Sequence, residues 1–119
     1  MIETVIFDLG EVYLTGMIGA EREISRGLCM NAAETWSHLN HDGLTDLFRG
    51  ETTEDAYWEG FMQQTGSPPA INGMPALDFF RLAMRKNFRE IGGTVKIATA
   101  IGNASYKLVL LSDHAREWI

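Results

Sequence analysis

The fold is decided by the stretch Val5-Ile6-Phe7-Asp8-Leu9-Gly10-Glu11-Val12. The apolar run from Ile2 to Phe7 is short and rich in Val and Ile, which predicts a fully buried strand of a parallel sheet. The run ends on Asp8, and open α/β sheets bind ligands at the carboxyl ends of their strands. Gly10 allows the backbone after the strand to approach a ligand closely. Taken alone, Asp8 is equally well explained as a residue that caps a turn.

A second apolar run, from Tyr106 to Leu111, also ends on small polar residues, Ser112 and Asp113. It predicts a second buried strand. The helix expected from Thr94 to Gly102 is then the crossover that returns the chain to the sheet, with the usual right-handed connection. Ser112 and Asp113 also suit a helix N-cap that needs no ligand, and the same geometry serves both roles.

Between the two strands, apolar residues recur at helical spacing. The pattern predicts a helix from Met17 to Met30, a second capped by Asn31, and a short segment from Leu44 to Phe48. A further helix follows Thr52 or Thr53, either of which can cap it. It carries an aromatic stripe that we assign to the core: Tyr57, Trp58 and Phe61. A helix from Ala76 to about Phe88 ends the series, after turns at Gly66-Ser67-Pro68-Pro69 and Asn72-Gly73-Met74-Pro75.

Composition narrows the class of protein. The 119 residues carry a net charge of −6 and no basic cluster, which argues against a nucleic-acid surface. No apolar run approaches the length of a membrane span, and no signal peptide is visible. A single cysteine, Cys29, excludes an internal disulfide framework and is expected to be a small buried residue. We therefore expect a cytoplasmic protein without membrane or nucleic-acid partners.

The two strand ends resemble the first two motifs of the haloacid dehalogenase-like hydrolases. Phe7-Asp8-Leu9-Gly10 is similar to the first motif, and Leu110-Leu111-Ser112-Asp113-His114 to the second. The nearest likeness is to sugar-phosphate phosphatases with Asp-Leu-Gly-Asn-Val in the first motif. The resemblance implies an α/β fold: a Rossmann-like parallel-sheet core, with only its first two strands present, and an inserted type-1 helical cap. Residues 1–15 and 76–119 then form the core, and 16–75 the cap.

The resemblance also implies chemistry. Asp8 is the expected nucleophile of a phosphatase that forms an aspartyl-phosphate, and Asp8 and the Gly10 carbonyl are the expected ligands of Mg²⁺. Phosphate binding is expected from the backbone N–H groups of Leu9 and Gly10, the Ser112 hydroxyl and the Asp113 N–H. The substrate implied is a small phosphorylated metabolite, which the sequence does not identify further.

The sequence departs from the family pattern at three places. Gly10 stands where most of these phosphatases carry a second Asp as general acid and base, so the sequence does not identify the general acid. Glu11 follows directly, and it either points outward or takes over proton transfer. The chain ends at Ile119, before the family's later Lys and acidic metal-binding motif, so we expect it to be the N-terminal part of an enzyme.

Two alternatives stay open. A 2-haloacid dehalogenase also uses an Asp nucleophile, without metal, but usually with a bulky aromatic residue at the position of Gly10. A non-catalytic fragment that associates with a partner chain is the other. Because the outer edges of a two-stranded sheet lack partners, we expect the chain to self-associate or to pair with the missing C-terminal part.

Other polar residues have simpler explanations. His38, His41 and Asp42 lie close enough for a metal site, but a solvated helix end is the favoured interpretation. Arg49, in Arg-Gly-Glu, matches a residue that recurs in the cap of similar phosphatases. A solvated charge is the favoured interpretation there too, with a contact to substrate as the alternative.

Overall fold

The computed structural model describes residues 1–112, 115 and 118. Its sheet is formed by β1 (Thr4–Asp8) and β4 (Lys107–Leu111), which run parallel in a register that pairs Thr4 with Lys107 and Asp8 with Leu111. This pairing and the crossover between the strands confirm the predicted α/β fold. The second strand begins one residue later than predicted, after Tyr106.

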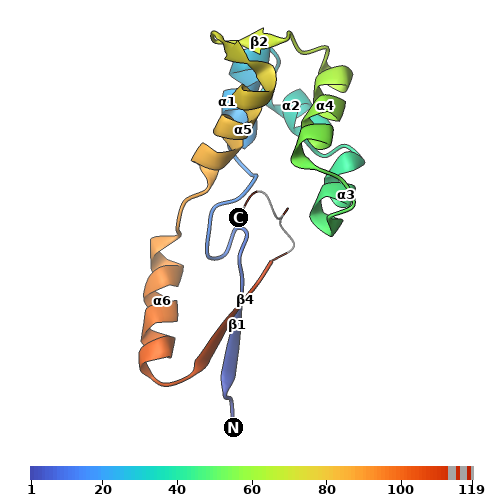
Figure 1. Ribbon diagram of the computed structural model, residues 1–119. Helices are drawn as coiled ribbons and strands as arrows, with labels where there is room; N and C mark the ends of the chain where they lie inside the picture. The colour runs from blue at the N-terminus through green and yellow to red at the C-terminus, as the bar shows by residue number, and fades with distance from the viewer. Residues whose placement is uncertain (113–114, 116–117, 119) are drawn as a thin grey trace.

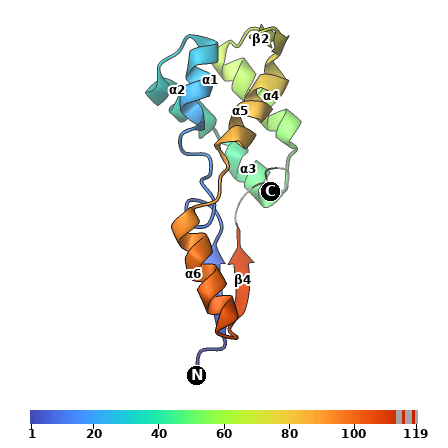
Figure 2. The ribbon, with the colours of Figure 1, turned by 90° about the vertical axis from the view of Figure 1, so that its left-hand side faces the viewer.

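Among the described residues, five helices form a bundle beyond the carboxyl ends of the two strands, and a sixth lies beside the sheet (Figure 1). They are α1 (Ala20–Leu28), α2 (Ala32–Leu39), α3 (Gly43–Arg49), α4 (Glu54–Thr65), α5 (Ala76–Asn87) and α6 (Gly92–Asn103). A hairpin of β2 (Ala70–Ile71) and β3 (Met74–Pro75) joins α4 to α5. The turned view shows the same division, with the bundle above and α6 beside β4 (Figure 2). The molecule measures 55 × 28 × 23 Å.

Polar caps set the start of two helices as predicted. The Asn31 side chain accepts a hydrogen bond from the Glu34 N–H at 2.7 Å, and the Thr53 hydroxyl accepts one from the Ala56 N–H at 3.2 Å. These bonds satisfy N–H groups that have no partner in the first helical turn. The helix expected from Thr94 begins two residues earlier, at Gly92, with Ile91 at the N-cap.

Helix α1 is shorter than the predicted Met17–Met30 segment. Gly19, before its first residue, and Cys29, after its last, both adopt left-handed backbone conformations that no α-helix continues through. Cys29 is exposed, so its expected burial is wrong. The cause is its position at the helix end, where the chain turns away from the bundle core.

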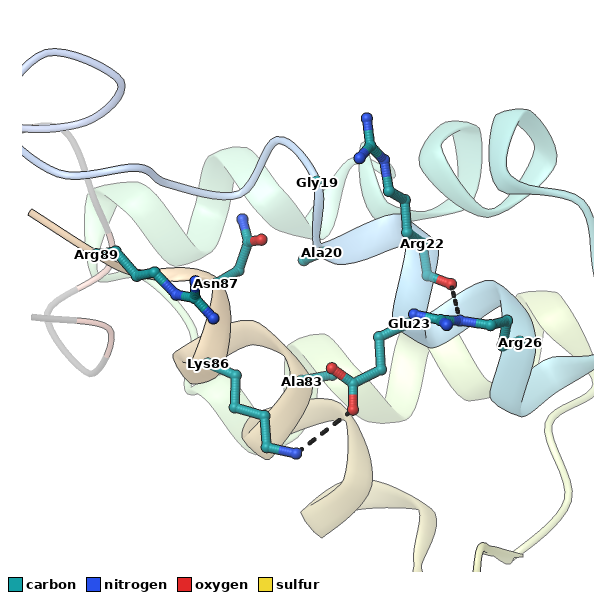
Figure 3. Close-up of a pocket in the computed structure, with 9 residues that line it drawn as sticks. All are labelled: Gly19, Ala20, Arg22, Glu23, Arg26, Ala83, Lys86, Asn87 and Arg89. Carbon is teal, nitrogen blue, oxygen red and sulfur yellow. Dashed lines mark hydrogen bonds and ion pairs between the residues drawn. The ribbon is translucent and has the colours of Figure 1, made fainter. Parts of the chain in front are cut away.

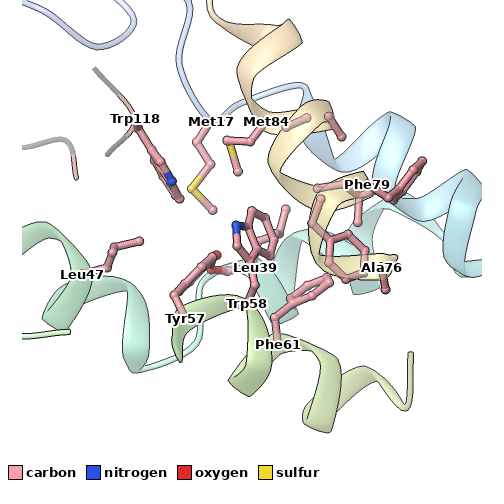
Figure 4. Close-up of a cluster of buried hydrophobic side chains, with 14 of the residues drawn as sticks. Met17, Leu39, Leu47, Tyr57, Trp58, Phe61, Ala76, Phe79, Met84 and Trp118 are labelled. Atoms are coloured by element: carbon pink, nitrogen blue, oxygen red, sulfur yellow. Dashed lines mark hydrogen bonds between the residues drawn. The ribbon is translucent and has the colours of Figure 1, made fainter. Parts of the chain in front are cut away.

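The core lies in the helical bundle and is rich in aromatic side chains (Figure 4). Tyr57, Trp58 and Phe61 of α4 are at most 1% exposed, which confirms the core assignment of this stripe. Trp58 stacks on Phe80 of α5, with ring centroids 5.3 Å apart. The Tyr57 hydroxyl donates to the Leu39 carbonyl at 2.6 Å, and burial raises the pKa of this phenol.

A buried carboxylate also links α4 to α5. Glu54 is 4% exposed and accepts hydrogen bonds from Trp58 Nε1 at 3.2 Å and from both terminal nitrogens of Arg85, at 3.3 and 2.9 Å. Arg81 adds an ion pair with Glu54 and another with Asp55. A charge can be buried in this way because it is paired and hydrogen-bonded.

The sheet is less buried than predicted. Ile6 is 61% exposed and Leu111 65% exposed, so the prediction of fully buried strands is wrong. The reason is that α6 packs beside β4 and covers only one face, on which Val5 and Phe7 are half-buried. No helix in the described part of the chain is long and apolar enough to cross a bilayer.

Helix α5 packs against α1, α4 and the β2–β3 hairpin, whereas α6 packs against β4. By contacts alone, α5 lies with the helical bundle. The expected division into a core of residues 1–15 and 76–119 and a cap of 16–75 stays a prediction.

Candidate active site

Asp8 is the last residue of β1 and lies at the end of the sheet that faces the helical bundle. The register places it opposite Leu111, the last residue of β4. Its side chain is exposed, and within the described residues its carboxylate has no hydrogen-bond or ion-pair partner. An exposed carboxylate at the carboxyl end of a parallel strand is suited to meet a ligand.

The backbone after Asp8 turns back on itself, and the turn leaves the N–H and carbonyl of Gly10 without hydrogen-bond partners among the described residues. The Leu9 N–H donates to the Leu111 carbonyl at 2.9 Å and so extends the strand ladder. The Leu9 carbonyl accepts from the N–H groups of Tyr13 and Leu14, at 3.0 and 2.9 Å. In the described part of the chain, neither the N–H nor the carbonyl of Gly10 has a partner. Of the two amides expected to meet phosphate, that of Leu9 is thus already engaged, and that of Gly10 is open.

Glu11 holds the loop that leads away from the site. Its carboxylate accepts hydrogen bonds from the N–H groups of Gly16, at 2.8 Å, and Ile18, at 3.3 Å. Its backbone adopts φ 59°, an uncommon conformation for a residue other than glycine. Sequence reasoning left the side chain either outward or catalytic and missed this role. The spacing of five to seven residues between carboxylate and amides follows no local rule that would have revealed it.

The two segments that join the sheet to the bundle are bound to each other. The Thr15 N–H donates to the Arg89 carbonyl at 2.7 Å, and the Arg89 N–H donates to the Thr15 hydroxyl at 2.8 Å. Asn87 adds two bonds from its amide nitrogen, to the carbonyls of Gly16 at 2.5 Å and Ile18 at 2.8 Å. The loop after Asp8 is therefore fixed by Glu11 on one side and by Asn87 on the other.

Ser112 directly follows β4 and is exposed, one residue beyond the pair formed by Asp8 and Leu111. The structure thus brings together the strand ends that carry Asp8 and Ser112, as expected if both belong to one site. Asp113 lies outside the described residues.

The other candidate residues lie in the helical bundle. The His41 ring stacks on Tyr57, with centroids 4.7 Å apart, and its Nδ1 accepts from the Gly43 N–H at 3.0 Å. His41 is therefore a packing residue, and the described residues contain no group of three or more His, Cys, Asp or Glu side chains that could hold a metal ion. Arg49 is exposed at the end of α3, as expected for a solvated charge.

The fold has a counterpart among solved structures. The model is similar to the crystal structure of a HAD family enzyme from Bacteroides thetaiotaomicron, in complex with magnesium and inorganic phosphate. The TM-score is 0.71 and the sequence identity 14%, and the match covers 99% of this chain but 56% of that enzyme. No protein-family model matches the sequence, and no curated protein matches it significantly. The likeness shows that the chain has the fold of the corresponding part of a haloacid dehalogenase-like enzyme.

Proposed function

We propose that this chain carries the nucleophile and part of the phosphate site of a Mg²⁺-dependent phosphatase that acts on a small phosphorylated metabolite. The observation that carries the proposal is the parallel register. It sets the exposed Asp8 carboxylate beside the strand end from which Ser112 follows. The magnesium and phosphate bound by the structurally similar enzyme support the same class of chemistry.

The donor groups fit a hard cation. Within the described residues, the Asp8 carboxylate has no hydrogen-bond or ion-pair partner and the Gly10 carbonyl oxygen accepts no hydrogen bond. Mg²⁺ prefers oxygen ligands and usually keeps several waters, so two protein ligands are compatible with it. When bound there, the ion would neutralise negative charge on the transferring phosphoryl group.

In the proposed reaction, one Asp8 carboxylate oxygen attacks phosphorus while the bond to the ester oxygen of the substrate breaks. The Ser112 hydroxyl and the Gly10 and Asp113 N–H groups would hold the phosphoryl oxygens. Water then hydrolyses the aspartyl-phosphate and restores Asp8. Gly10 has no side chain to protonate the leaving group, and the Glu11 carboxylate is engaged by two amides, so the acid comes from another residue or from solvent.

A phosphatase assay on the protein expressed from its complete gene tests the proposal. With p-nitrophenyl phosphate and Mg²⁺, Asp8→Asn should reduce turnover by at least a hundredfold, whereas Asp46→Asn, an exposed substitution on α3, should leave it unchanged. A chelator should abolish the activity, and Mg²⁺ should restore it. Wild-type activity in the Asp8→Asn variant would overturn the assignment. Release of halide from a 2-haloacid without metal would support the dehalogenase alternative.

A second function is favoured by a separate observation. Ile6 and Leu111 expose apolar surface on the face of the sheet that α6 does not cover, and such strands are templates for pairing with another chain. We therefore keep, as a second proposal, that the chain associates through this sheet with a copy of itself or with a further polypeptide.

A further inference from the structure

A cavity of about 520 Å³ opens between α1 and α5, on the helical bundle (Figure 3). Asp8, Gly10 and Ser112 do not line it. Its volume lies in the range of pockets that hold small metabolites, about 300 to 1,000 Å³. Whatever it binds is therefore bound by a set of residues separate from the proposed active site.

The lining of this cavity is strongly cationic. Arg22, Arg26, Lys86 and Arg89 contribute four positive charges, against one carboxylate, that of Glu23. The chain has ten Lys and Arg residues and a net charge of −6, so two fifths of its cations surround one cavity of an acidic protein. A concave site lined by one sign of charge concentrates ligands of the opposite sign.

Among the described residues, only two of these four cations form an ion pair or a side-chain hydrogen bond. Lys86 pairs with Glu23 at 3.6 Å, and Arg26 Nε donates to the Arg22 carbonyl at 3.2 Å. The guanidinium groups of Arg22 and Arg89 have no acceptor within the described residues. By contrast, Arg81 and Arg85 on the same helix, α5, are neutralised by carboxylates of α4. Positive charge therefore remains without a paired carboxylate at the cavity, within the described residues, whereas Arg81 and Arg85 on α5 are paired.

The base of the cavity is fixed and kept open. Asn87 is held by its bonds to the Gly16 and Ile18 carbonyls. Gly19 adopts φ 104°, and a Cβ atom at this position would lie 3.1 Å from Asn87 Oδ1. A larger residue at position 19 would be strained and would crowd Asn87. The site therefore combines a polar residue held by two hydrogen bonds with four exposed cationic side chains.

We infer that this cavity binds a phosphorylated small molecule at a second anion site, independent of Asp8. Arg side chains bind phosphate oxygens with two parallel hydrogen bonds, and a dianionic phosphate matches several cations better than a single carboxylate does. The inference does not depend on the proposed phosphatase activity.

Glu23 gives the inference a distinctive consequence. Its carboxylate forms an ion pair with Lys86 in the absence of ligand, and Figure 3 shows it projecting between Lys86 and Arg26. An incoming phosphate has to displace it from Lys86 and is repelled by its charge. Replacing Glu23 by Gln should therefore strengthen anion binding, whereas neutralising the arginines should weaken it.

Isothermal titration calorimetry with pyrophosphate, in EDTA and at fixed salt, tests the site without metal-dependent binding at Asp8. We expect saturable binding of one pyrophosphate per chain, unchanged in Asp8→Asn. Arg22→Gln/Arg89→Gln should raise Kd at least tenfold. The control Lys96→Gln/Lys107→Gln, which removes the same charge from exposed positions outside the cavity, should change it less than twofold. Glu23→Gln should lower Kd severalfold. Absence of saturable binding, loss of it in Asp8→Asn, equal weakening in the two double variants, or no gain in Glu23→Gln would overturn the inference.

Discussion

Substitution of Gly27 by Ala should destabilise the protein, although Ala is the better helix former. Gly27 lies inside α1, and a Cβ atom there would come within 2.6 Å of two Phe79 ring carbons and 3.0 Å of Ile71 Cγ2. Favourable carbon contacts need about 3.5–4.0 Å. Phe79 and Ile71 are each 4% exposed, so neither can move aside without disturbing the core. Overpacking of this kind costs about 1–3 kcal/mol, against a gain of about 1 kcal/mol from helix propensity.

Gly60 supplies the matched control, because it lies inside α4 and makes no such contact. Its Cβ would lie 3.4 Å from the nearest His41 atom, an ordinary van der Waals distance. Gly60→Ala should therefore keep most of its gain of about 1 kcal/mol. Urea unfolding followed by circular dichroism should find Gly27→Ala less stable than Gly60→Ala by about 1–3 kcal/mol. Equal or greater stability of Gly27→Ala would refute the packing of α1 against Phe79.

Three further perturbations follow from the structure. Glu54→Ala should lower the free energy of unfolding by about 2–4 kcal/mol, because it leaves the buried Trp58 Nε1 without its hydrogen-bond acceptor. The loss should be smaller than that for breaking a fully buried ion pair, because the Arg85 side chain is 44% exposed. Equal urea midpoints for variant and wild type would contradict this. Because burial raises the pKa of Tyr57 in the folded state, stability should be complete below the unfolded pKa of about 10 and should fall as pH rises above it. In urea melts, the free energy of unfolding of Tyr57→Phe should decline less steeply at alkaline pH than that of the wild type. The same pH dependence in both proteins would argue against the buried phenol. Ile6→Lys/Leu111→Lys should shift light scattering toward monomer, and unchanged association would exclude the open sheet face as its cause.

Local signals in the sequence predicted most of the fold. Asn31 and Thr53 cap helices because a side-chain oxygen reaches an amide three residues on, which is a short-range rule. The aromatic stripe of α4 was assigned correctly to the core because helical spacing places Tyr57, Trp58 and Phe61 near one another. Asp8 and Ser112 became candidate site residues because Asp8 ends one apolar run and Ser112 follows the other, and their roles stay a prediction.

The features that the sequence did not predict depend on contacts between residues that are far apart in sequence. The burial of β1 depends on what covers the sheet, and within the described residues only one face is covered, by α6. Nothing near Glu11 indicates that its carboxylate binds the Gly16 and Ile18 amides. The cavity between α1 and α5 brings Arg22 and Arg26 together with Lys86 and Arg89, which lie 60 or more positions further along the chain, so no local pattern reveals that these cations meet.

The most direct test of the proposed active site is an amide NMR titration of the protein with Mg²⁺ and orthophosphate. We expect saturable shifts of the Gly10 and Ser112 amide resonances that require both ions. These shifts should disappear in Asp8→Asn and persist in the Asp46→Asn control. The absence of shifts at both residues, or the same shifts in Asp8→Asn, would contradict the claim that the adjoining ends of β1 and β4 form a phosphate site.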